Sequence, residues 1–176
     1  MKNKTLLKIS LFTILVCSCT AFKPAKEKFM PGYSSNSLED LNKPFKKKVE
    51  KLIVNMQKRG YNVDVSQTFR DYERQEYLFE TSLKLKKLTG QDIKVTTTKR
   101  SHHNHTHNGM PASCAVDLRP VLTYLPHSQV EFYKVMRDEA KKLGLRSGAD
   151  FKRTTFFHKK YDIGWDPGHI YTTSCK

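Results

Sequence analysis

The chain has 176 residues, with 32 lysines and arginines against 17 aspartates and glutamates, so its formal net charge is +15. No internal repeat is visible, which excludes a repeat architecture. So basic a surface attracts polyanions, and the partner class then depends on the compartment.

The first 19 residues are typical of a targeting segment. Lys2, Lys4 and Lys8 supply positive charge before the apolar run Ile9–Val16, which is too short for a comfortable membrane span. Cys19 follows Val16 and Ser18 as in a bacterial lipoprotein signal, so it resembles a lipidation site. Cys17, an ordinary cleaved signal and an uncleaved anchor are the alternatives. We expect export to the periplasm or cell surface, with a lipid anchor to the membrane.

Residues 20–44 are predicted to form a flexible linker, because Pro24, Pro31 and the run Ser34–Ser37 carry no apolar periodicity. Residues 45–176 then form one domain of ordinary size. We expect this domain to be monomeric.

Apolar spacing predicts the domain's elements. Val49, Leu52, Ile53 and Met56 indicate a helix over Pro44–Arg59. Alternation predicts a strand over Tyr61–Ser66, and a second helix follows over Asp71–Leu88. The expected apolar face of that second helix comprises Tyr72, Tyr77, Leu78, Leu83, Leu85 and Leu88.

The C-terminal half continues with mixed elements. We expect a short buried strand over Ala115–Leu118, a helix over Ser128–Leu143 and a last strand over His169–Thr173. Helices and short strands alternate irregularly, which favours the α+β class.

The stretch Ser101–Pro120 contains the candidate metal-binding side chains: His102, His103, His105 and His107, and Asp117 near its end. Imidazole and carboxylate are preferred zinc ligands, and a catalytic zinc takes three of them plus water. His169 offers the third ligand, so we predict zinc on His103, Asp117 and His169. His107 is the alternative ligand, and a solvated histidine-rich loop is the alternative interpretation.

Other side chains support or compete with this prediction. Arg70 falls at a strand-to-helix junction, where it could hold a substrate carboxylate or pair with Asp71 or Glu73. In an oxidising compartment, Cys114 and Cys175 could form a disulfide bracing the two metal-bearing segments, or remain two buried thiols.

Four pieces of the chain occur in the order of a known family. They are the segment Ser66–Gln75, the motif Ser101–His103 with Ala115–Asp117, the segment Gly144–Phe151, and Asp166–His169. Together they resemble the zinc D-Ala-D-Ala carboxypeptidase and L-alanyl-D-glutamate endopeptidase family, including its phage-endolysin members. This resemblance implies a short, mainly antiparallel, Hedgehog-like sheet packed by about three helices.

The resemblance also implies roles. Zinc would lie on His103, Asp117 and His169, Asp166 would be the general base and acid, and Arg70 would steady the substrate or its transition state. The family usually has six residues between the metal histidine and aspartate, whereas this chain has 13, so the loop carries an insertion. Asp at position 166 resembles the endopeptidase members more than the others.

We therefore expect an exported zinc peptidase acting on peptidoglycan stem peptides. A catalytically silent, zinc-stabilised wall-binding domain is the alternative. Nucleic acid is not expected as a partner, because an export signal accompanies the lysines and no nucleic-acid motif does.

Overall fold

The computed structural model describes residues 32–91, 96–121, 126–153 and 155–175. The expected signal segment, Cys19 and the first part of the expected linker lie outside these residues. Within the described residues, no helix is both long and apolar enough to cross a membrane.

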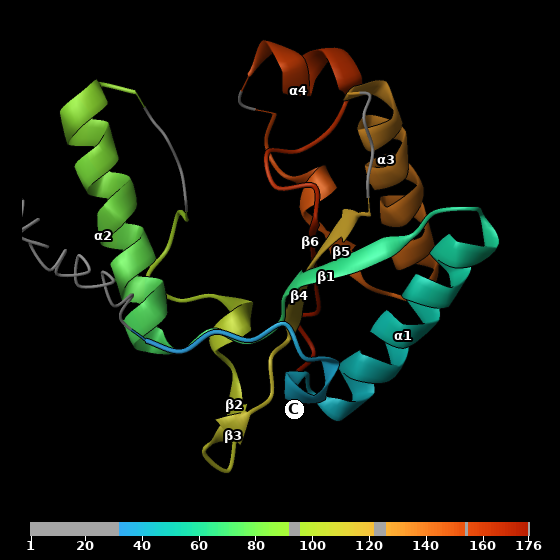
Figure 1. Cartoon of the computed structure of the whole chain (residues 1–176), viewed down its shortest axis with the longest axis horizontal. Coiled ribbons are helices and arrows are strands. Elements are labelled where there is room, and N and C mark those ends of the chain that lie inside the picture. The colour runs from blue at the N-terminus through green and yellow to red at the C-terminus, as the bar shows by residue number, and fades with distance from the viewer. Residues whose placement is uncertain (1–31, 92–95, 122–125, 154, 176) are drawn as a thin grey trace, which may run out of the picture.

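The centre of the fold is a four-stranded antiparallel sheet in the order β1-β4-β6-β5 (Figure 1). Its strands are β1 (Val63–Gln67), β4 (Ala115–Pro120), β5 (Arg146–Ser147) and β6 (His169–Tyr171). A separate hairpin, β2 (Thr106–His107) with β3 (Met110–Pro111), stands away from this sheet. The sheet and its helices confirm the α+β prediction.

The two faces of the sheet have different roles because side chains alternate along a strand. Val116 and Leu118 of β4 and Ile170 of β6 are fully buried in the core. The intervening residues, Asp117 and His169, therefore lie on the opposite face. One face of the sheet builds the core and the other carries polar groups.

Helices α1 (Lys43–Lys58) and α3 (Pro126–Lys142) pack together and cover the apolar face. Both helices lie where the spacing of apolar residues predicted them. The core that they share with the sheet consists of Leu41, Phe45, Val49, Leu52, Met56, Val116, Leu118, Phe132, Met136, Ala140, Leu145 and Ile170.

Helix α2 (Tyr72–Thr89) forms as predicted, but its predicted apolar face does not exist as a packed surface. Tyr72, Leu83 and Leu88 are exposed in the described part of the chain, and the helix buries Gln75 and Ser82 instead. Its apolar residues are scattered around the helix circumference, so no single stripe can face a core. In Figure 1 this helix stands apart from α1 and α3.

The expected linker ends earlier than residue 44. The backbone nitrogen of Ser35 donates to Phe69 and that of Thr68 donates to Ser35, while Leu41 is buried in the core. Residues 33–42 are thus bound to the domain by backbone pairing, which needs no apolar periodicity and so left no signal in the sequence. A fourth helix, α4 (Phe156–Tyr161), was also not predicted.

We predict that Glu139→Gln lowers the free energy of unfolding by about 1 kcal/mol at pH 7. The buried Glu139 carboxylate accepts from Asn55 at 3.1 Å, from Arg59 at 2.7 Å and from Lys142 at 2.7 Å, joining α1 to α3. Urea titration measures the change, and Glu131→Gln on the exposed side of α3 is the control.

The same bonds, led by the one from Lys142, lower the pKa of Glu139 in the folded state. Its contribution is present above the unfolded-state pKa and is lost as the pH falls through the lower folded-state pKa. The gap between wild type and Glu139→Gln should therefore shrink under acid conditions. A gap that stays constant down to pH 3 would contradict this account.

Candidate metal centre

The register of β4 and β6 brings two predicted ligands together. Asp117 lies directly opposite His169 in this antiparallel pair. The Nδ1 atom of His169 is 2.9 Å from Oδ1 of Asp117. Neighbouring strands thus supply one imidazole and one carboxylate at the same point of the polar face.

His103 reaches the same point from a short 3-10 helix, His102–Asn104, that precedes the hairpin. Its Nδ1 atom lies 2.6 Å from the carbonyl oxygen of Thr68, the residue that follows β1. Because a carbonyl can only accept, Nδ1 carries the proton and Nε2 presents its lone pair. Nε2 lies 3.3 Å from Asp117 Oδ1 and 3.3 Å from His169 Nδ1.

These three donor atoms fit a zinc ion. Tetrahedral coordination with ligand distances of about 2.0–2.1 Å places neighbouring donors about 3.3 Å apart. The observed separations of 2.9, 3.3 and 3.3 Å describe such a triangle. The three residues also form one of the two groups of potential metal ligands found among the described residues.

The electrostatics of this triangle suit a cation. Burial opposes ionisation of Asp117, but the adjacent imidazoles of His103 and His169 outweigh it and hold the pKa of this carboxyl far below its ordinary value. The carboxylate is therefore charged and ready to bind metal. His107, the alternative ligand, is exposed in β2 and does not join the group.

Arg70 lies at the junction predicted for it, but it is buried and makes no ion pair with Asp71 or Glu73 within the described part of the chain. Its Nε atom is buried without a hydrogen-bond partner. Burial lowers the pKa of Arg70, while attraction to Asp117 and Asp166 acts in the opposite direction. The guanidinium therefore belongs to the same charged cluster and keeps a free donor.

Asp166 borders the cluster from the loop before β6. Burial, followed by repulsion from Asp117, raises the pKa of Asp166, whereas His169, His103 and Arg70 lower it. Gly148 fixes this loop: a Cβ at that position would meet the Asp166 carbonyl oxygen at 2.0 Å. The Asp-Pro-Gly turn thus packs against a position that only glycine can occupy.

Several residues around the site were not assigned a role from the sequence. The aromatic rings of Phe151 and Trp165 stack at 5.8 Å, and Phe151 and Tyr171 lie 6.1 and 5.3 Å from the His169 ring. Phe151, Trp165 and Tyr171 come from separate segments of the chain, so the spacing of residues in the sequence could not reveal that they form an aromatic wall beside His169. Asn104 was also missed; its Nδ2 donates to the Arg70 carbonyl oxygen at 2.6 Å and joins the histidine loop to the β1–α2 junction.

The predicted cysteine pair is also brought together. Cys114 and Cys175 form a disulfide with their Cα atoms 6.0 Å apart. It joins the residue before β4 to the segment after β6, so it ties together the two strands that carry Asp117 and His169.

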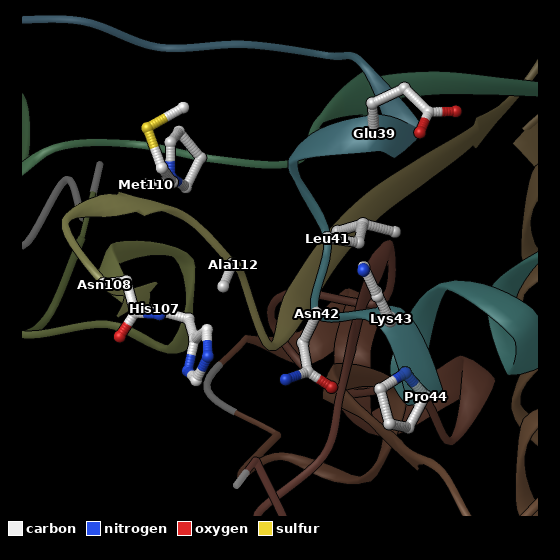
Figure 2. A pocket seen from close by; sticks show the side chains of 10 residues that line it. Glu39, Leu41, Asn42, Lys43, Pro44, His107, Asn108, Met110 and Ala112 are labelled. Atoms are coloured by element: carbon white, nitrogen blue, oxygen red, sulfur yellow. The ribbon is translucent and has the colours of Figure 1, made fainter.

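A pocket of about 440 Å³ lies elsewhere, between the hairpin and the start of α1. Figure 2 shows His107 on the hairpin side and Asn42 with Pro44 on the helix side. None of the three candidate ligands lines it, nor does Arg70 or Asp166. This pocket is therefore separate from the candidate metal centre.

A His–Asp–His donor set beside the partly buried carboxyl group of Asp166 has the chemistry of a zinc hydrolase site. The family model VanY, described as D-alanyl-D-alanine carboxypeptidase, matches residues 38–150. The chain belongs to this family of peptidoglycan peptidases. The matched stretch includes Arg70, His103 and Asp117 and ends before Asp166 and His169. No curated protein sequence matches the chain.

Solved structures share the fold. The vancomycin-resistance D,D-pentapeptidase VanY, solved in complex with Zn(II), is 13% identical with a TM-score of 0.54, and the match covers 77% of this chain and 74% of that one. The LD-carboxypeptidase LdcB is 17% identical with a TM-score of 0.50, over 77% of this chain. This chain spans 60% of the length of LdcB.

We predict that His103→Ala loses the bound zinc, lowering its affinity at least about 100-fold, because one of three protein ligands disappears. His107→Ala should keep one zinc per chain. Equilibrium dialysis with elemental analysis of the oxidised protein measures both. If His103→Ala kept its zinc and His107→Ala lost it, His107 would be the ligand, and the assignment of zinc to His103, Asp117 and His169 would be wrong.

We also predict that Gly148→Ala destabilises the fold by about 1–3 kcal/mol, because the new Cβ collides with the Asp166 carbonyl. Gly60→Ala is the control: nothing lies near its Cβ, but its φ of +83° costs about 1 kcal/mol. Thermal unfolding and zinc titration measure both variants. Only Gly148→Ala should also lower the affinity for zinc, because it displaces the loop before His169. If its zinc affinity is unchanged, the packing at Gly148 does not position His169.

Proposed function

We propose that the chain is an exported zinc peptidase that hydrolyses peptide bonds in peptidoglycan stem peptides, of the L-Ala-D-Glu endopeptidase or D-Ala-D-Ala carboxypeptidase type. Family membership supports the substrate class. The observation that carries the mechanism is the triangle of donor atoms on His103, Asp117 and His169, with Asp166 and Arg70 in the same charged cluster.

In this proposal His103 Nε2, Asp117 Oδ1 and His169 Nδ1 hold the zinc. A zinc ion bound there would lower the pKa of a water molecule to about 7 and polarise the scissile carbonyl. The protein contributes rigidity, because two donors lie on paired strands and the third is held by the Thr68 carbonyl oxygen. Such second contacts keep the imidazole orientation fixed.

Asp166 is the proposed general base and acid. Its pKa is raised by burial and by Asp117 and lowered by the nearby histidines and Arg70, so its proton affinity is tuned by its neighbours. It accepts the proton of the attacking water and returns it to the nitrogen of the leaving amine. The backbone of Asp166 packs closely against Gly148, and this contact holds the loop that carries the carboxyl group.

Arg70 is the proposed partner for negative charge on the substrate. Its guanidinium lies in the same charged cluster as Asp117 and Asp166, so it would donate to a stem-peptide carboxylate or to the oxygen that gains charge as water attacks. Phe151 and Tyr171 offer apolar surface beside the His169 ring, and Trp165 extends it by stacking on Phe151. A peptide with carboxylates along its length is a suitable ligand for this combination.

The proposal includes export and anchoring. The targeting segment supports transfer across the membrane, and lipid on Cys19 would tether the domain within reach of the wall. Removal of Lys2, Lys4 and Lys8 with the signal segment would leave 29 basic against 17 acidic residues, a net charge of +12 that favours attraction to the anionic polymers found there.

We predict that Asp166→Asn keeps the fold and one zinc per chain but lowers the hydrolysis rate about 10²–10⁴-fold, because the amide cannot accept the water proton. Asp162→Asn is the matched control, since Asp162 is exposed in the preceding segment and pairs with Arg153. Mass spectrometry of muropeptides after digestion of purified peptidoglycan measures the rates, with and without a chelator.

The products identify the bond. Loss of a terminal D-alanine indicates a carboxypeptidase, and release of stem peptides cut after L-alanine indicates an endopeptidase. Equal rates for wild type and Asp166→Asn would exclude Asp166 as the base. A zinc-loaded chain that yields no products from several wall types would instead be a wall-binding domain.

A further inference from the structure

We propose that Cys114, Cys175 and His105 form a second zinc site, available only when the disulfide between the two cysteines is reduced. The donor atoms of these three residues all lie within 4.8 Å of one another. None of them belongs to the His103, Asp117 and His169 triangle. Two sulfurs and one imidazole are a donor set that zinc favours in structural sites.

Backbone hydrogen bonds hold Cys114 and His105 in place independently of the disulfide. Cys114 N donates to the His102 carbonyl at 2.9 Å, and Thr172 N donates to the Cys114 carbonyl at 3.0 Å. His105 and Ala112 are joined by a backbone bond of 3.0 Å. Cys175 is four residues after the end of β6, and Ser174 N donates to Thr172 Oγ1 at 3.2 Å, so this short segment would keep the reduced thiol within reach of Cys114.

The His105 ring is oriented for metal binding. Its Nδ1–H donates to the carbonyl oxygen of Ala112 at 2.9 Å, which leaves the Nε2 lone pair unused. The same backbone-to-imidazole contact orients His103 at the first site. His105 lies just before β2 in the inserted loop, so the proposed site gives a role to a histidine that the first site does not use.

The site also has room for a fourth ligand. His105, Cys114 and Cys175 line a pocket of about 410 Å³ that also includes His102. A water molecule entering from this pocket, or the His102 ring, could complete a tetrahedron.

The chemistry requires a reductant, and a phosphine serves in the experiment. The phosphine gives two electrons to the sulfur–sulfur bond and ends as its oxide with an oxygen from water, and the two protons of that water go to the sulfurs. Each thiol then releases its proton when it binds zinc as a thiolate. The metal would replace the disulfide as the link between β4 and the segment after β6 in the reduced chain.

Cobalt titration of the full chain tests this proposal, because cobalt bound to thiolate gives a near-ultraviolet charge-transfer band that nitrogen and oxygen ligands do not. Cys17→Ser and Cys19→Ser remove the other thiols. We expect one cobalt and no such band in the oxidised chain. The phosphine-reduced chain should bind two, with the band.

Two variants assign the ligands. His105→Ala retains both cysteines and should lower the affinity of the reduced chain for the second cobalt at least about 100-fold. His107→Ala, two residues away and exposed, should leave that affinity unchanged. A reduced chain that binds one cobalt without the band, or a second cobalt unaffected by His105→Ala, would overturn the proposal. Neither result bears on the first site, whose occupancy is measured in the oxidised chain.

Discussion

The antiparallel register of β4 and β6 is the constraint on which the rest of the structure depends. It places Asp117 opposite His169 and, in the next row, Val116 opposite Ile170. Because side chains alternate, the same register sends the first pair to the polar face and the second into the core. A slip of one residue would bury the carboxylate and expose the apolar pair. Formation of the core under α1 and α3 therefore also assembles two of the three metal donors.

The third donor depends on a different set of contacts, made by backbone carbonyls and one amide side chain. Thr68 orients the His103 ring, and Asn104 joins the histidine loop to Arg70. The backbone nitrogen of Arg70 donates in return to the His103 carbonyl at 3.1 Å. The residues that would hold the metal and the arginine that would hold substrate charge are consequently parts of one rigid junction, which suits a site that must position a water and a peptide together.

Much of this arrangement could be predicted from the sequence where the signal was local. Periodicity located α1 and α3, and motif order singled out His103, Asp117 and His169. His103 was preferred over His107 from the sequence, and the hairpin, which exposes His107 at the surface, agrees with that preference. The packing of residues 33–42, the exposed apolar residues of α2 and the wall of Phe151 and Trp165 arise from contacts between distant segments, so no short window carries them.

Zinc K-edge X-ray absorption on the oxidised, zinc-loaded chain tests the central claim most directly, because it reports the donor atoms themselves. The donor triangle predicts four nitrogen or oxygen ligands at about 2.0–2.1 Å, with the scattering pattern of two imidazoles and no sulfur. Sulfur in the coordination shell, or six oxygen-type ligands without imidazole, would contradict the assignment of zinc to His103, Asp117 and His169.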